Sequence, residues 1–239
     1  MSALAPPRVR NDPAQYDDLA AEWWRPGGAY AALRWLASAR ARLLPSPPPA
    51  GALLVDVACG GGLMAPHTDG YRHLGIDLSL ASLRQARAHG LCCVQGDATA
   101  LPLPDAVADV VVAGEIFEHL SPDDLPAAVA EIARVLRPGG LVLCDTINAT
   151  WWARFSVITV GERLRGIAPK GCHDHRLFVP PQRLQEAFAR HGIALEVHGL
   201  RFSWRDFLAF VASRDRQVRM LPTRSLAAVY QGYGRKAAM

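Results

Sequence analysis

The chain has 239 residues, a length that suits one α/β domain with additional helices and a sizeable core. Its net charge of +4 is too small to indicate a nucleic-acid partner. The five cysteines form no C-x-x-C pair, which argues against a zinc site or a disulfide framework and favours a reducing compartment. No apolar run approaches ~18 residues, and no apolar signal core follows Arg8 and Arg10, so we expect a cytoplasmic protein.

The first fifty residues predict helices that precede a sheet. Residues 1–13 are rich in proline and arginine and predict a loose arm. Over residues 15–44 apolar side chains recur at helical spacing, and Pro26-Gly27-Gly28 divides this segment into two helices. The adjacent Trp23 and Trp24 either pack these helices on the sheet or close over a flat or apolar ligand.

A buried strand is predicted over residues 53–57, where an apolar run leads into the glycines of residues 60–62. Glycines let the backbone turn sharply and approach a ligand, and residues 63–68 can begin a helix whose free N–H groups point at that ligand. Asp56, at the strand end, can accept hydrogen bonds from a cationic or hydroxylated group. Gly60-x-Gly62-x-x-Ala65 also satisfies a dinucleotide-binding fingerprint, so a nicotinamide-linked oxidoreductase stays an alternative at this point.

Strands and helices then alternate, which predicts parallel strands joined by right-handed crossovers. The predicted strands cover residues 71–77, 91–95, 105–113 and 141–146, and the predicted helices cover residues 80–87 and 122–136. Asp77 ends a strand at the edge where such folds bind ligands, and it can take both hydroxyls of a ribose. Asp97, in the turn Gly96-Asp97-Ala98, either faces an adenine edge or only caps its loop.

Residues 148–175 interrupt the alternation. Trp151, Trp152 and Phe155 could line one side of a helix with Arg154 nearby, and this helix is too short to span a bilayer. We expect a mobile lid over the acceptor and a peripheral membrane contact through residues 148–175, with ordinary core packing as the alternative. Beyond this segment we expect helices over residues 181–191 and 204–211 and strands over residues 193–200 and 226–233, without a repeat or a second domain.

Five short motifs in order resemble those of class I S-adenosylmethionine-dependent methyltransferases. They are Val55-Asp56-x-x-x-Gly60-x-Gly62, Gly75-Ile76-Asp77, Gly96-Asp97-Ala98, Asp109-Val110-Val111 and Leu136-Arg137-Pro138-Gly139-Gly140. The resemblance implies a Rossmann-like α/β fold with a seven-stranded sheet in the order 3-2-1-4-5-7-6, strand 7 antiparallel, and S-adenosylmethionine as cofactor. We therefore expect one domain over residues 1–239, with a helical extension (1–50), a cofactor-binding core (51–147), a lid inserted after strand 5 (148–180) and a C-terminal part of the sheet (181–239).

A narrower likeness points to the ubiquinone-biosynthesis O-methyltransferases. It rests on Trp23-Trp24 with Gly28, on Glu115-x-x-Glu118-His119, and on Pro169-Lys170-Gly171-x-His173-Asp174 with Phe178. The resemblance implies O-methylation of an aromatic small molecule, a phenol or catechol such as a prenylated quinone precursor. Ala58 replaces the family's first glycine, Arg34 replaces a histidine, and the family's C-terminal motifs are absent. Methylation of a specialised natural product at oxygen, nitrogen or carbon is therefore the alternative, and a non-catalytic S-adenosylmethionine-binding protein is another.

The resemblance and the strand ends together assign residues to three roles. Those expected to hold the methyl donor are Arg40, Asp56, Ala58, Gly60, Gly62, Asp77, Leu78, Asp97, Ala98, Gly114 and Glu115. Those expected against the acceptor are Trp23, Trp24, Trp151 and Trp152. Methyl transfer requires alignment of the acceptor and removal of its proton, for which His119 is the first candidate base and His173, or the nearby His175, the second.

Glu115, Glu118 and His119 have the i, i+3, i+4 spacing of one face of a helical turn. Two carboxylates and an imidazole could hold Mg²⁺, which would bind the catechol oxygens and make them more acidic. Alternatively, the two glutamates are solvated residues of a turn. The sequence leaves the oligomeric state open.

Overall fold

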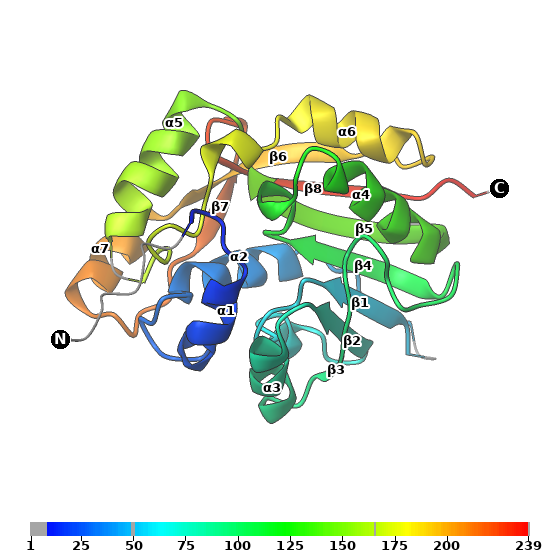
Figure 1. The fold of residues 1–239 in the computed structure, drawn as a ribbon, viewed down its shortest axis with the longest axis horizontal. Coiled ribbons are helices and arrows are strands. Elements are labelled where there is room, and N and C mark those ends of the chain that lie inside the picture. The colour runs from blue at the N-terminus through cyan, green and yellow to red at the C-terminus, as the bar shows by residue number, and fades with distance from the viewer. Residues whose placement is uncertain (1–8, 49–50, 165, 239) are drawn as a thin grey trace.

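The computed structural model describes residues 9–48, 51–164 and 166–238. One sheet holds eight strands in the order β3-β2-β1-β4-β5-β8-β6-β7 (Figure 1). Their bounds are β1 (Leu53–Val57), β2 (Arg72–Asp77), β3 (Cys92–Gln95), β4 (Ala108–Gly114), β5 (Leu136–Ile147), β6 (Glu196–Phe202), β7 (Met220–Thr223) and β8 (Val229–Arg235). β1 to β5 are parallel, whereas β8 runs antiparallel to both β5 and β6.

The prediction of seven strands is one too few, because β7 adds an edge strand beside β6. This strand has only four residues and contains Pro222, which the edge of a sheet tolerates but which weakens any sequence signal for a strand. The other seven strands keep the predicted order, with β8 as the predicted antiparallel strand 7. The helix expected over residues 63–68 is only the short 3₁₀ turn η2 (Ala65–His67), which contains Pro66.

Successive residues of the central strands point to opposite faces of the sheet, and a layer of helices covers each face. On one face Val55, Val111 and Val142 share a buried cluster with residues of α4 (Asp124–Val135) and α6 (Pro181–Ala189). On the other face Leu54, Val112 and Leu143 pack with residues of η1 (Ala20–Glu22) and α2 (Ala31–Ala41). The strands therefore present their carboxyl ends as an edge between two packed layers.

Helical segments surround this edge of the sheet. They are α1 (Ala14–Asp18), α3 (Leu80–Ala88), η3 (Phe117–His119), α5 (Trp151–Ala153), the π-helix η4 (Arg154–Val160), η5 (Gly161–Arg163), η6 (His175–Leu177) and α7 (Trp204–Ala212). In Figure 1 the helix labelled α5 and helix α7 both lie beyond the strand ends, on the side away from the C-terminus. None of the described helices is long and apolar enough to cross a bilayer.

Candidate active site

A cavity of about 860 Å³ lies at the carboxyl ends of the parallel strands. The predicted donor residues that line it are Arg40, Asp56, Ala58, Gly60, Asp77, Leu78, Asp97, Ala98, Gly114 and Glu115. Gly62 is not among the lining residues. A Cβ at Gly62 would lie 3.1 Å from Ala86 Cβ and from Leu91 Cδ2, so this glycine lets α3 and the segment after α3 pack closely on the glycine-rich turn. The sequence motifs thus converge on one cavity, although not every motif residue faces it.

The glycine-rich turn is packed against Trp23. Gly60 has φ +52°, and a Cβ at this residue would lie 2.4 Å from the indole of Trp23. Trp23 is buried, lines the cavity and donates a hydrogen bond from Nε1 to Ser82 Oγ at 3.0 Å. Trp24 does not line the cavity: its Nε1 donates to Gly61 O at 2.8 Å, and its ring stacks on His89. Trp24 therefore packs against the glycine-rich turn and His89 and, unlike Trp23, does not reach the cavity in which an acceptor contact is predicted for it.

Asp77 is held at the end of β2 by backbone groups. Its Oδ2 accepts from Gly60 N and its Oδ1 from Ser79 N, both at 2.8 Å. Burial raises the pKa of Asp77, and the two N–H bonds oppose this shift. Asp97, by comparison, lines the cavity while its Oδ1 accepts from Thr99 N at 2.8 Å, so it also caps its own loop.

A buried ion pair joins α2 to β5 beneath the cavity. Arg40 donates to Asp145 from Nε at 2.9 Å and from Nη2 at 2.5 Å, and Glu115 N donates to Asp145 Oδ1 at 3.1 Å. A Cβ at Gly114 would lie 2.0 Å from the Arg40 guanidinium, so glycine makes room for this side chain. Sequence reasoning missed Asp145, although a lone carboxylate within the apolar run of residues 141–146 is a signal for a buried polar partner.

Glu115 and Glu118 are not solvated turn residues. Glu118 is fully buried, and its Oε2 accepts from Thr146 Oγ1 at 2.6 Å. Burial raises the pKa of both carboxyl groups, and the neighbouring charges of Glu118 and Asp145 raise the pKa of Glu115 further. In the part of the chain that the structure describes, Glu115 Oε1 and Glu118 Oε1 have no hydrogen-bond partner.

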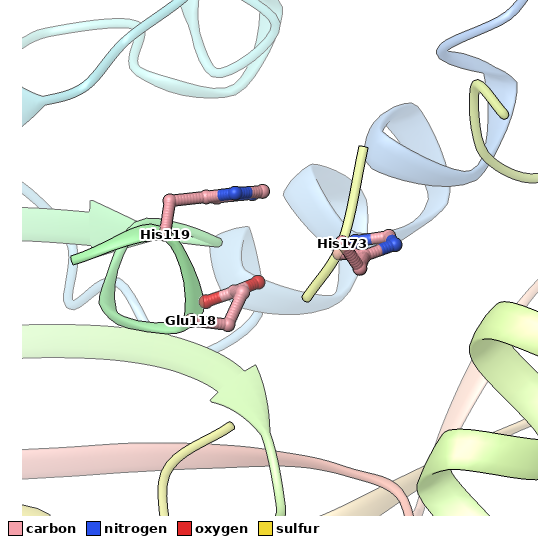
Figure 2. A group of neighbouring side chains, drawn as sticks. All are labelled: Glu118, His119 and His173. Carbon is pink, nitrogen blue, oxygen red and sulfur yellow. The ribbon is translucent and has the colours of Figure 1, made fainter. Parts of the chain in front are cut away.

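The predicted metal group is only partly assembled. Among the described residues, ligand atoms lie within 4.8 Å of one another in two groups: Glu118, His119 and His173 (Figure 2), and Glu162, Cys172 and His173. Glu115 belongs to neither group. The expected helical face does not form, because Glu115 has φ +55° and η3 is a 3₁₀ turn. Figure 2 shows Glu118 and His119 on the turn after β4 and His173 on a separate segment.

His119 lines the cavity and has a hydrogen-bond partner at each ring nitrogen. Its Nδ1 lies 2.5 Å from Asn11 Oδ1, and its Nε2 lies 3.1 Å from Tyr16 OH. Burial, with the nearby His173, lowers the pKa of His119 to about 3. His173 also lines the cavity, and its ring stacks on that of His119 at 5.6 Å; His175 does not line the cavity.

The expectation of a loose arm over residues 1–13 is wrong for the part that the structure describes, residues 9–13. Asn11 N donates to Gly171 O at 2.9 Å, and Arg10 Nε donates to His173 O at 2.6 Å. Arg10 Nη2 also pairs with Glu162 Oε1 at 2.6 Å. Residues 1–8 lie outside the described residues. The arm thus joins the turn after β4 to the segment after β5, which no local sequence pattern indicated.

The segment after β5 covers part of the cavity. Trp152, Phe155 and Val160 line it, whereas Trp151 does not and is 77% exposed. Of these two tryptophans, both predicted to meet the acceptor, Trp152 lines the cavity and Trp151 does not. The same cavity is also lined by apolar residues of α2, α7, β6 and β7, which form its apolar branch: Leu33, Trp35, Leu36, Leu200, Phe202, Phe207 and Met220.

Comparison with known proteins agrees with this geometry. Residues 55–144 match the family model of a methyltransferase domain. A ubiquinone biosynthesis O-methyltransferase of Idiomarina loihiensis is 32% identical over 205 residues, which cover 80% of this chain and 82% of the relative. The ubiquinone biosynthesis O-methyltransferase of Xylella fastidiosa is 35% identical over 198 residues, which cover 77% of this chain and 79% of the relative. A crystal structure of an S-adenosylmethionine-dependent methyltransferase from Thermotoga maritima superposes with a TM-score of 0.66 at 19% identity, covering 92% of this chain and 97% of that one, which supports the fold.

Proposed function

This chain belongs to the ubiquinone biosynthesis O-methyltransferase family of S-adenosylmethionine-dependent methyltransferases, and on that premise we propose that it methylates an oxygen of a lipophilic phenol or catechol, such as a quinone precursor. The observation that carries this proposal is the continuity of one cavity from the glycine-rich turn, past His119, into the apolar branch. Such a cavity can hold the donor, a reacting aromatic ring and an apolar tail together.

The residues at the strand ends fit S-adenosylmethionine. Each oxygen of Asp77 accepts one backbone N–H and keeps a lone pair for a ribose hydroxyl. At the amino-acid end of the donor, the Arg40 guanidinium would face the carboxylate and Glu115 the ammonium group. Glu115 Oε1 lacks a partner among the described residues, and a cation beside it would favour its ionised form despite its burial.

Bound S-adenosylmethionine supplies a methyl group already activated by its sulfonium. The protein has to align the acceptor, exclude water and accept the hydroxyl proton. His119 is placed for this last task because it lines the cavity. The burial that lowers its pKa keeps the imidazole neutral but also weakens it as a base, so proton transfer depends on the acidity that the acceptor hydroxyl gains as its bond to the methyl carbon forms. His173 supports the site from the other segment: its Nδ1 lies 3.1 Å from Cys172 Sγ and 3.6 Å from Glu162 Oε1.

The described residues fit Mg²⁺ poorly. Mg²⁺ prefers oxygen ligands in octahedral geometry, whereas the converging group offers one carboxylate and two imidazoles. Both ring nitrogens of His119 also have hydrogen-bond partners already. We therefore expect turnover to be unchanged by EDTA. Loss of activity in EDTA that Mg²⁺ restores would contradict this expectation.

We also propose that the molecule meets a membrane surface at the mouth of the cavity. Trp151, Trp204 and Leu208 are 77%, 64% and 66% exposed, and they lie on α5 and α7, which are both beyond the strand ends in Figure 1. Exposed arginines of the same segments, Arg154, Arg163 and Arg205, could meet anionic headgroups. A tailed acceptor resides in the bilayer, so this position would give it access to the cavity. A localisation peripheral to the membrane follows from the proposal.

Sedimentation with vesicles of anionic phospholipid tests the membrane contact. The double variant Trp151→Ser/Leu208→Ser should lose binding, because neither side chain lines the cavity and both are exposed. Val94→Ser, at an exposed valine of β3 at the other edge of the sheet, is the matched control and should bind like the wild type. Equal sedimentation of the wild type and the double variant would contradict the proposal.

The proposed reaction is tested with methyl-labelled S-adenosylmethionine and catechols, with mass spectrometry of the product. We expect a labelled methyl ether and strongly reduced transfer in His119→Ala. Labelled amine or carbon products from other acceptors, with no transfer to any catechol, would favour the natural-product alternative. Donor binding without any transfer would favour a binding protein.

A further inference from the structure

Two residues of the N-terminal segment complete the site around His119. We propose that Asn11 is a positioning residue that fixes the tautomer of His119, and that Tyr16 passes the proton of the acceptor hydroxyl to His119 Nε2. This inference deepens the proposed function. The proton transfer through Tyr16 rests on the proposed O-methylation. Neither residue belongs to a motif of the sequence analysis, and both reach the site through the packing of the arm and α1.

The contacts of Asn11 determine which of its side-chain atoms faces the imidazole. Asn11 Nδ2 donates to the backbone carbonyl of His119 at 3.0 Å. Its Oδ1, an acceptor only, therefore faces His119 Nδ1 at 2.5 Å, and Nδ1 must carry the hydrogen. In the neutral ring Nε2 is then the basic nitrogen, and it faces the cavity side occupied by Tyr16. Asn11 thus determines where on the ring a proton can be accepted.

The hydrogen bond between Tyr16 and His119 determines the path of the proton. The Nε2 lone pair accepts the hydroxyl of Tyr16 at 3.1 Å, so a proton that reaches Nε2 in this arrangement arrives through Tyr16. Tyr16 is held in place, because its ring stacks with those of Trp23 and Tyr30 and its segment α1 packs on α3. Tyr16 itself lines the cavity, beside the donor residues.

The proposed step moves one methyl group and two protons. The acceptor oxygen forms its bond to the methyl carbon as the carbon–sulfur bond breaks, and the electron pair of that bond stays on sulfur. The acceptor O–H gives its proton to the Tyr16 oxygen while the Tyr16 O–H gives its proton to His119 Nε2. The products are the methyl ether, the neutral thioether, neutral Tyr16 and protonated His119, which then releases its proton to solvent.

The left-handed backbone of residue 11 allows a matched pair of variants. Asn11 has φ +59°, a conformation that aspartate and glycine tolerate well. Asn11→Asp keeps an oxygen acceptor for His119 Nδ1 but loses the donor to the His119 carbonyl, whereas Asn11→Gly removes both contacts without straining the backbone. Two-bond ¹H–¹⁵N NMR spectra of the ¹⁵N-labelled protein report the tautomer directly. We expect the Nδ1–H form of His119 in the wild type and Asn11→Asp, and a shift toward the Nε2–H form in Asn11→Gly.

Measurements of activity test the role of Tyr16 separately from that of Asn11. Tyr16→Phe keeps the stacked ring and removes the hydroxyl, so we expect kcat for a catechol to fall about a hundredfold or more while the affinity for S-adenosylhomocysteine is unchanged. Wild-type kcat in Tyr16→Phe would overturn the relay and leave His119 as a direct base. An Nε2–H tautomer in the wild type would overturn the role of Asn11. Because NMR needs no turnover, failure of the wild type to methylate any catechol would count against the proposed function and not against the tautomer assignment.

Discussion

At the scale of single residues, the glycine-rich turn shows why the motif requires glycine. Gly60 and Gly139 both have left-handed backbones, with φ +52° and +75°, but a Cβ at Gly60 would collide with Trp23 and one at Gly139 would meet nothing within 4 Å. Left-handed strain alone costs about 1–2 kcal/mol for a residue with a Cβ. We therefore expect Gly60→Ala to lower the free energy of unfolding by clearly more than Gly139→Ala, as measured by urea denaturation. Equal losses would mean that the Trp23 contact does not constrain the turn.

Asp77 provides the residue-scale test of donor binding. Removing its carboxylate in Asp77→Ala should weaken binding of S-adenosylhomocysteine, since each charge-assisted hydrogen bond contributes roughly 1.5–3 kcal/mol. Isothermal titration calorimetry measures this change. Asp69→Ala removes an exposed carboxylate that does not line the cavity and should bind like the wild type. Unchanged affinity in Asp77→Ala would refute its assignment to the ribose.

At the scale of elements, the Arg40–Asp145 pair holds α2 on β5. Both side chains are buried, so Asp145→Leu would leave the charge of Arg40 without its partner. We expect a loss of about 3–5 kcal/mol in the free energy of unfolding, and a smaller loss in the double variant Arg40→Leu/Asp145→Leu. The surface pair Arg219–Asp206 is the control, and Asp206→Asn should cost clearly less than Asp145→Leu. Additive losses in the double variant would show that the two charges are not coupled.

Glu162 joins the arm to the segment after β5 and makes stability depend on pH. Its hydrogen bonds with Arg10, His173 and Gly171 N outweigh its desolvation and lower the pKa of Glu162 to about 2. Because the folded state binds fewer protons than the unfolded state, this stabilisation is present above about pH 4.5 and is lost as the pH falls toward 2. Its full size is on the order of 3 kcal/mol.

The matching experiment compares urea denaturation at pH 5 and at pH 3. Glu162→Gln should be less stable than the wild type at pH 5, and its stability should fall less steeply between the two pH values. Glu186→Gln, on the exposed side of α6, should keep the wild-type slope. If Glu162→Gln kept that slope as well, the carboxylate would not anchor the arm in the way that the contacts indicate.

At the scale of the whole molecule, local sequence patterns predicted the order of seven strands and the strand ends that line the cavity. The strand over residues 53–57 formed as expected, because a buried apolar run that leads into glycines is a local signal. The strand predicted over residues 71–77 also formed, as β2 (Arg72–Asp77). The edge strand β7 and the left-handed Glu115 were missed, since pairing and backbone strain depend on contacts distant in sequence. Asn11 and Tyr16 lie 108 and 103 positions from His119, so only the folded chain reveals that they share a site.

The central claim is that one cavity holds both the reacting ring and an apolar tail, and the dependence of kcat/KM on tail length tests it most directly. For catechols with a growing alkyl chain, kcat/KM should rise several-fold per buried methylene, about 0.8 kcal/mol each, until the apolar branch is filled. Ala32 lines the cavity and packs against the cluster that contains Trp35, Leu36 and Leu200 of the apolar branch. Ala32→Phe should therefore stop the rise in kcat/KM at a shorter tail and leave kcat/KM for the tailless catechol unchanged. Values of kcat/KM that do not change with tail length, in the wild type and in Ala32→Phe alike, would contradict the account.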